Sequence, residues 1–175
     1  GYMERKRNLD PAEIYDQVVL INDQTQKSTG KNLTNIVFMG MGEPLLNYSN
    51  VLTAIDKITS EEGLNMSAKR ITVSTAGIAK MIKKLADDNV RFNLALSLHA
   101  ADDEKRNTIM PINEQNNIAV LIEALQYFQA NCKGEVTFEY ILLDGVNDTL
   151  DDAKKLVDIC KQLHDVKINV IEYNK

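Results

Sequence analysis

VTFEYILLDGVNDTLDDAKKLVDICKQL, residues 136–163, is the stretch of sequence that decides the fold. Residues 136–143 form an apolar run with aromatic and β-branched side chains, which predicts a strand. After the turn pair Asp144-Gly145, apolar residues recur at helical spacing and predict a helix. These residues are Leu150, Ala153, Leu156, Val157, Cys160 and Leu163. A strand followed directly by a helix predicts a βα unit, from which parallel sheets are built.

The same alternation of strand and helix extends from this stretch toward both ends of the chain. Further strands are predicted at residues 36–39, 71–73, 92–98 and 167–171. Further helices are predicted at residues 10–21, 51–58, 78–85 and 118–128, with the polar residues 25–35 as a loop. The first helix starts with Asp10 as N-cap, Pro11 at its first position and Glu13 closing a capping box.

This order of elements predicts an α/β fold of five parallel strands and five helices with right-handed crossovers. The pattern alone leaves two architectures open, a partial (βα) barrel and an open doubly wound sheet. Because the order begins with a helix, we expect a first strand upstream of residue 1. The edge of the sheet where that strand belongs is then expected to be covered by a terminal segment or by a neighbouring chain.

Length and composition indicate one globular domain spanning residues 1–175, with 44% hydrophobic and 26% charged residues. No apolar run approaches the roughly 20 residues that cross a bilayer, so we expect a cytoplasmic protein without a membrane partner. The net charge of −5 argues against strong nucleic-acid binding by this chain alone. Cys132 and Cys160 lack metal-type spacing and are predicted to be buried thiols in a reducing compartment.

Small and hydrogen-bonding residues follow the predicted strands at the points where the strands end. These are Gly40-Met41-Gly42-Glu43, Ser74-Thr75, Ser97-Leu98-His99, Asp144-Gly145 and Tyr173-Asn174. In parallel α/β folds, ligands bind at the carboxyl ends of the strands. The sequence therefore predicts a binding site that is built from several strand ends.

Most of these residues also have a structural interpretation. Glu43 fits either a solvated turn or an acceptor for an amine or for ribose hydroxyls, with the neighbouring glycines letting a ligand approach the backbone. Ser74 could cap the helix that follows it, and His99 could be a structural histidine. The chain contains no Walker loop, no G-x-G-x-x-G, no Cys–His pair and no His/Cys cluster. No catalytic or metal-ligating residue is therefore assigned.

Six strings, in order and at suitable spacing, carry a resemblance to a known family. They are FMGMGEPLLN (38–47), RITVSTAGI (70–78), LALSLHA (94–100), DDEKRNTIMPIN (102–113), VTFEYILLDGVNDT (136–149) and INVIEYN (168–174). Together they resemble the radical S-adenosylmethionine RNA methyltransferases that methylate carbon 2 of an adenosine. RNLDPAEIYDQV, residues 7–18, resembles the family segment that follows the cluster loop. The resemblance covers essentially the whole chain.

The resemblance implies a partial (βα)6 barrel, of which residues 1–175 are the radical SAM core with strands 2 to 6. It also implies S-adenosylmethionine (SAM) and a 4Fe–4S cluster as cofactors. Implied partners are ribosomal RNA, transfer RNA as a possible second substrate, and a reductant such as flavodoxin. In the family, a radical made from SAM abstracts hydrogen from a methyl group carried on a cysteine, and the resulting carbon radical adds to the adenine ring.

Matched residue by residue, the resemblance implies contacts with SAM at seven positions. These are Gly42, Glu43, Ser74, Ser97, Leu98, His99 and Asn174. The CxxxCxxC loop and the methyl-carrying cysteine of the family have no counterpart here, so the 175-residue chain is expected to be inactive by itself. Two alternatives remain: the sister enzymes that methylate carbon 8 and confer antibiotic resistance, and a non-radical (βα) small-ligand binding protein. Pro44 favours the carbon-2 branch.

Overall fold

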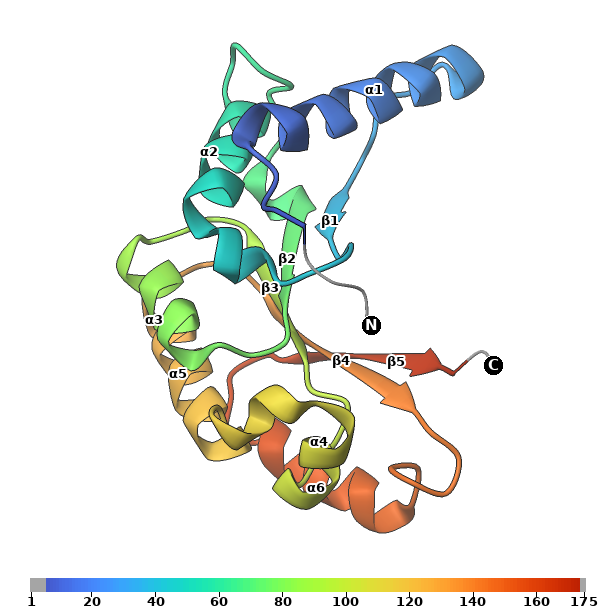
Figure 1. The fold of residues 1–175 in the computed structure, drawn as a ribbon, viewed down its shortest axis with the longest axis vertical. Helices are drawn as coiled ribbons and strands as arrows, with labels where there is room; N and C mark the ends of the chain where they lie inside the picture. The colour runs from blue at the N-terminus through green and yellow to red at the C-terminus, as the bar shows by residue number, and fades with distance from the viewer. Residues whose placement is uncertain (1–5, 174–175) are drawn as a thin grey trace. The chain divides into compact units, whose positions relative to one another are not determined.

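The structure is a computed structural model that describes residues 6–173 (Figure 1). Its helices are α1 (Pro11–Thr29), α2 (Tyr48–Thr59), α3 (Ala79–Asp87), α4 (Asp103–Ile109), α5 (Ile118–Asn131) and α6 (Leu150–Cys160). Its strands are β1 (Ile36–Phe38), β2 (Ile71–Thr75), β3 (Asn93–Ser97), β4 (Val136–Leu142) and β5 (Lys167–Glu172). The chain divides into two compact units, Gly1–Val73 and Ser74–Lys175.

Helix α1 of the first unit begins as the sequence predicts. The Asp10 carboxylate accepts from the backbone N–H of Glu13 at 2.9 Å, and the Glu13 carboxylate accepts from the Asp10 N–H at 3.0 Å. Pro11 occupies the first turn, and the helix ends at Gly30, whose φ of 71° is left-handed. The predicted capping box is therefore confirmed.

The predicted loop over residues 25–35 is wrong for its first five residues, because α1 continues to Thr29. The hydroxyls of Thr25, Ser28 and Thr29 each donate to a main-chain carbonyl one turn back. These bonds keep polar side chains satisfied on the helix surface, so their polarity does not end the helix. The left-handed Gly30, rather than the change in composition, sets the boundary.

Strand β1 pairs in parallel with β2, with Ile36 opposite Ile71 and Phe38 opposite Val73. Helices α1 and α2 pack against each other in the same unit (Figure 1). The buried face of α2 consists of residues at helical spacing, Val51, Ala54, Ile55 and Ile58. The apolar periodicity that predicted this helix is thus the pattern of its core contacts.

The second unit contains a parallel sheet of β3, β4 and β5. Strand β3 pairs with β4 and β4 pairs with β5, while helices α3 and α5 pack on each other. Alternate strand residues share a face of a sheet. One face of β3 and β4 is apolar and fully buried, with Leu94, Leu96, Val136 and Phe138.

The opposite face of this sheet carries polar side chains in register. Ser97 lies opposite Glu139 across β3 and β4, and Glu139 lies opposite Asn169 across β4 and β5. The Asn169 amide donates to the Glu139 carboxylate at 2.6 Å, and Glu139 is buried. A polar row on one face of an otherwise apolar sheet is a feature of ligand-binding sheets rather than of a packed core.

Helix α4 and the short 3-10 turns were not predicted from the sequence. The Asp102 carboxylate caps α4 by accepting from the Lys105 N–H at 2.9 Å. The helix has only seven residues, and of these only Arg106 is buried. Apolar periodicity therefore gave no signal, and the chain has six helices in its described part instead of the predicted five.

All strand pairs described within each unit are parallel, and helices follow the strands, so the predicted α/β class is confirmed. Within residues 6–173, no helix is both long and apolar enough to span a bilayer. Cys132 and Cys160 are free thiols, as predicted; Cys132 is buried, but Cys160 is only half-buried, so its predicted burial is wrong.

Candidate functional site

The loop that follows β1 holds two of the predicted site residues, Gly42 and Glu43. Gly42 has a φ of 92°, a conformation that side chains rarely adopt. Glu43 precedes the 3-10 turn Pro44–Asn47 and accepts from the Leu45 N–H through Oε1 at 3.0 Å. A Cβ added at Gly40 or Gly42 would meet nothing within 4 Å, so the backbone of the loop is open to an approaching ligand.

A pocket of about 530 Å³ lies within the first unit beside this loop. The residues that line it include Gly40, Met41, Gly42 and Glu43 as well as apolar residues such as Phe38. The volume falls in the range of small-molecule sites, which combine an apolar lining with a few polar groups. Glu43 is the one carboxylate among the lining residues.

Ser74 and Ser97 contribute hydroxyl groups at two strand ends of the second unit. Ser74 does not cap α3, because the N-cap position of that helix is Ile78, which makes no side-chain cap. The structural interpretation of Ser74 as a cap is therefore wrong. Both serines are half-buried, and neither hydroxyl has a hydrogen-bond partner among residues 6–173. Both are thus available to a ligand.

Arg106 hydrogen-bonds to the chain at both of these strand ends. Its Nη2 donates to the carbonyl of Ala76, just after β2, at 2.8 Å and to that of Ser97 at 3.1 Å. Its Nε donates to the carbonyl of Leu98 at 3.1 Å, and Nη1 donates to Asn113 Oδ1 at 2.6 Å. The side chain is fully buried. One guanidinium therefore fixes the spacing of two loops that carry predicted site residues.

None of the hydrogen-bond partners of Arg106 in the described part of the chain is a carboxylate. Burial lowers its pKa from 12.5 to about 10, partly opposed by the charge of Asp103. The guanidinium thus stays protonated at neutral pH. Its positive charge adds to burial in lowering the pKa of His99, so the imidazole is neutral at that pH.

His99 follows β3 with a φ of 57°, which is left-handed. Its ring Nδ1 accepts from the N–H of Ile141 on β4 at 3.2 Å. The structural interpretation of His99 is confirmed to this extent, since one nitrogen has a fixed structural partner. Leu98, in contrast, is fully buried, so its side chain belongs to the core.

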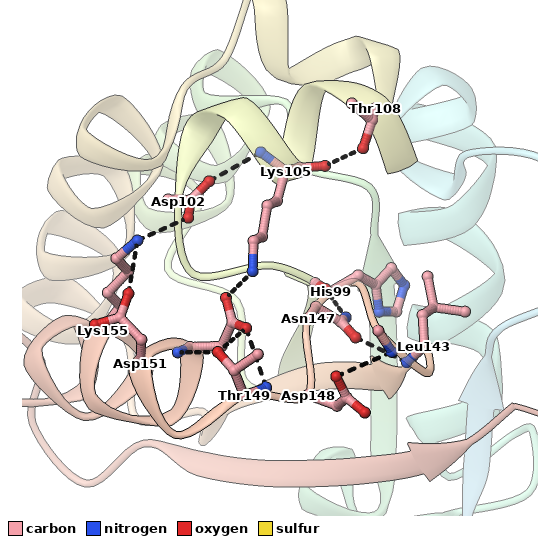
Figure 2. Close-up of polar contacts among 12 residues, drawn as sticks. His99, Asp102, Lys105, Thr108, Leu143, Asn147, Asp148, Thr149, Asp151 and Lys155 are labelled. Atoms are coloured by element: carbon pink, nitrogen blue, oxygen red, sulfur yellow. Dashed lines mark hydrogen bonds and ion pairs between the residues drawn. The ribbon is translucent and has the colours of Figure 1, made fainter.

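The loop between β4 and α6 lies against His99 (Figure 2). Asn147 from this loop donates to the carbonyl of His99 at 2.6 Å, and its own Oδ1 accepts from the Leu143 N–H at 2.7 Å. The start of α6 is joined to α4 by an ion pair between Lys105 and the buried Asp152 at 2.6 Å. Polar contacts therefore hold this loop at both of its ends.

Of the predicted site residues, Gly42 and Glu43 lie in the first unit, and Ser74, Ser97, Leu98 and His99 lie in the second. Asn174 lies outside the described residues. Sequence reasoning missed Arg106, Glu139 and Asn147. A charged residue inside the apolar string VTFEYILL was the available signal for Glu139. Arg106 and Asn147 stand in polar strings, where nothing marks them as buried.

Comparison with known proteins identifies the family. Residues 2–169 match the model of the radical SAM superfamily. The chain is 65% identical, over 99% of its length and 47% of the relative, to the probable dual-specificity RNA methyltransferase RlmN of Cytophaga hutchinsonii. It is 54% identical, over 98% of its length and 49% of the relative, to the protein of that name from Flavobacterium psychrophilum. The chain thus spans about half the length of these curated relatives.

Solved structures agree with this result. A radical SAM methyltransferase from Sphaerobacter thermophilus matches 97% of this chain and 49% of its own, with a TM-score of 0.91 and 39% identity. SuiB of Streptococcus suis, solved with S-adenosylmethionine, matches 98% of this chain and 36% of its own, with a TM-score of 0.65 and 18% identity, which shows a shared fold only. The chain belongs to the radical SAM superfamily, and the predicted partial barrel is confirmed.

Membership of this superfamily implies SAM and a 4Fe–4S cluster as cofactors. The described residues do not fit the cluster: residues 6–173 contain no group of three His, Cys, Asp or Glu side chains that could hold a metal. Burial raises the pKa of both Cys132 and Cys160, which disfavours the thiolates that ligate iron. For SAM, by contrast, an open glycine loop, a pocket and accessible hydroxyls are present.

Proposed function

We propose that this chain is the SAM-binding core of an RNA methyltransferase that modifies carbon 2 of an adenosine. The observation that carries the proposal is the Gly40–Glu43 loop, which forms one wall of a pocket of about 530 Å³. The high identity to proteins named as dual-specificity RNA methyltransferases supports the class of substrate. Ribosomal RNA, with transfer RNA as a second substrate, is accordingly the proposed target, and the cytoplasm the proposed location.

In this proposal, residues at several strand ends each make a different contact with SAM. Glu43 accepts from the amino group of the methionine part while Gly42 keeps the backbone close to it. Ser74 and Ser97 offer hydroxyl groups, and the turn of Leu98 and His99 offers main-chain groups and an imidazole. Asn174 belongs to the same proposed set. We propose that this core is part of a longer protein. In that protein it acts together with the cluster, the methyl-carrying cysteine and a flavodoxin-like reductant.

A charge substitution at Glu43 tests the SAM contact. Glu43→Gln keeps an oxygen that can accept from the Leu45 N–H, which stands 3.0 Å from the carboxylate, but removes the negative charge. In the longer protein with its cluster loaded, we expect SAM binding to weaken about tenfold, because a charge-assisted bond to an ammonium group is lost. Equilibrium dialysis with labelled SAM measures this, with iron content as a check on the cluster.

Glu61→Gln is the matched control, since Glu61 is exposed and lies outside the pocket. It should bind SAM as the unmodified protein does. Unchanged affinity in Glu43→Gln would show that the carboxylate only caps the turn. The reaction itself is tested by incubating the longer protein with ribosomal RNA, SAM and a reductant and analysing the nucleosides by mass spectrometry. Methylation at carbon 8 instead of carbon 2 would contradict the proposed branch.

A further inference from the structure

The turn that ends β3 has an uncommon backbone geometry. The N–H of Ala100 donates to the carbonyl of Leu98 at 2.7 Å, and the residue between them, His99, has a φ of 57°. A hydrogen bond between residues i and i+2 around a residue of positive φ is a strained γ-turn. Strain of this kind persists only where neighbouring contacts hold it, and it is concentrated at functional sites.

The strained turn changes how β3 pairs with β4. The N–H groups of Leu98 and His99 both donate to the carbonyl of Glu139. In a regular parallel ladder the Ile141 N–H would donate next to the carbonyl of Leu98. That carbonyl is already bonded to Ala100 N and to Arg106 Nε. The Ile141 N–H donates to His99 Nδ1 instead, so the imidazole takes the place of a main-chain carbonyl.

Asn147 makes further hydrogen bonds that hold the turn at His99 (Figure 2). Its Nδ2 donates to the carbonyls of His99 at 2.6 Å and of Ile141 at 2.7 Å, while its Oδ1 accepts from the Leu143 N–H. The Tyr140 hydroxyl donates to the carbonyl of Asn147 at 2.9 Å. Asn147 is 1% exposed, and its side chain uses both amide hydrogens and its oxygen. No other neutral side chain of this size supplies two donors and one acceptor.

These contacts fix the tautomer of His99. Because Nδ1 accepts from an N–H, it carries no proton, and the neutral ring carries its proton on Nε2. Within residues 6–173, Nε2 has no hydrogen-bond partner. A half-buried imidazole whose other nitrogen is already bonded thus presents a single donor with a fixed direction.

We propose that Asn147 is a positioning residue that holds His99 in the γ-turn, so that Nε2–H is presented as a neutral donor to an oxygen or nitrogen acceptor of bound SAM. The inference rests on the proposed function, in which residues 97–99 lie at the cofactor. Asn147 itself does not touch the ligand. It acts through the carbonyl of His99 and through Ile141, whose N–H orients the ring.

The tautomer can be measured without any cofactor. The chain contains two histidines, and the second, His164, has a side chain that is 88% exposed and carries its Nε2 3.1 Å from the Asp165 carboxylate. Long-range ¹H–¹⁵N correlation spectra of the ¹⁵N-labelled chain distinguish the two ring nitrogens. We expect His99 at neutral pH as a single Nε2–H tautomer. A mixture at His99 in the unmodified chain overturns the proposal whether or not SAM is bound.

Asn147→Asp removes both amide donors with almost no change in shape. We expect His99 to lose its single tautomer, because a carboxylate beside the carbonyls of His99 and Ile141 repels them. Asn117→Asp is the matched control: Asn117 is exposed and caps α5 through its oxygen, which aspartate also does. It should leave the His99 spectrum unchanged. A fixed tautomer that survives in Asn147→Asp overturns the proposed role.

Binding separates this inference from the proposed function. In the longer protein, Asn147→Asp should weaken SAM binding about tenfold with unchanged iron content, since one donor is misplaced. If Glu43→Gln weakens binding and Asn147→Asp does not, the positioning role is wrong while the proposed function stands. If neither substitution weakens binding, the SAM site itself is wrong, and the inference fails with it.

Discussion

Arg106 is a buried charged residue whose hydrogen bonds stabilise the surrounding structure, a role that we call bracing. Every hydrogen bond that it donates within residues 6–173 goes to a neutral acceptor: the carbonyls of Ala76, Ser97, Leu98 and Asn116, the amide oxygen of Asn113 and the sulfur of Met110. A buried cation is tolerated only where its N–H groups are satisfied in this way. Here three of the acceptors are carbonyls at the ends of two strands.

Replacing Arg106 tests this bracing role. Arg106→Met keeps a long side chain but leaves several buried carbonyls without a donor, and this loss outweighs the relief of removing a buried charge. We expect the free energy of unfolding to fall by about 3 kcal/mol in urea titrations followed by circular dichroism. Arg91→Met, at an exposed arginine, should change it little. Equal stability of the two variants would contradict the brace.

At the level of single residues, the sequence predicted candidate ligand contacts but not the residues that support them. Glu43, Ser74 and Ser97 were predicted as ligand contacts because parallel folds bind ligands at the ends of their strands. Arg106 and Asn147 were not found, because a long-range hydrogen bond leaves no pattern in the chain. Asn147 reaches His99, 48 residues away, only after the sheet has formed. Supporting residues of this kind are specified by tertiary contacts alone.

Among the secondary-structure elements, α4 and α6 are joined at their N-terminal ends by buried charge. The Asp152 carboxylate accepts from Lys105 Nζ at 2.6 Å and from the Thr149 hydroxyl at 2.6 Å. Burial by itself would raise the pKa of Asp152, but these hydrogen bonds hold the pKa below its usual 3.8. The folded state thus favours the ionised carboxyl.

This pKa predicts how stability depends on acidity. A carboxyl with a lower pKa in the folded state adds stability above its unfolded-state pKa and loses it as the pH falls through the folded-state value. We expect Asp152→Asn to be less stable at pH 7 by about 1–2 kcal/mol. The gap from the unmodified chain should narrow below pH 3.8, the ordinary value of the group. Urea unfolding at a series of pH values measures this gap.

The control is Asp144→Asn at an exposed turn, where asparagine is equally well suited. Its free energy of unfolding should stay close to that of the unmodified chain. A gap for Asp152→Asn that stays constant down to pH 2 would show that this carboxyl keeps its ordinary pKa. Such a result would mean that packing rather than charge joins α4 to α6.

Long periodic elements were predicted well, and short or polar ones were not. The strand and helix of residues 136–163 are present as β4 and α6, because apolar periodicity reports the contacts that stabilise them. Helix α4 was missed, since its seven residues bury only Arg106. The end of α1 was placed too early, because hydroxyl side chains that bond back to the helix look like loop residues in a sequence.

Across the whole molecule, the buried residues are distributed unevenly between elements. Helix α1 has 19 residues and buries only Ile14, and β1 has three residues, none of them fully buried. In the second unit, β3 buries three of its five residues and β4 buries four of its seven. Local opening is easiest where few apolar contacts are lost. These elements are therefore expected to differ in local stability.

Amide hydrogen exchange measured by mass spectrometry tests this difference. We expect peptides from α1 to exchange at least about tenfold faster than peptides from β3 and β4, because local opening of α1 exposes little apolar surface. The comparison within one sample needs no variant, and peptides from α5, which buries six residues, provide a second protected reference. Equal protection of α1 and β4 would mean that the helix opens only when the whole chain unfolds.

The γ-turn at His99 also limits how this chain can vary in length. A side chain that stands in for a main-chain carbonyl must remain opposite Ile141, so inserting or deleting one residue between Ser97 and Ala100 would move the imidazole away from that N–H. Connections elsewhere on the surface tolerate length changes readily. In an alignment of related sequences, insertions and deletions should therefore avoid residues 97–100 even where the amino acids themselves differ.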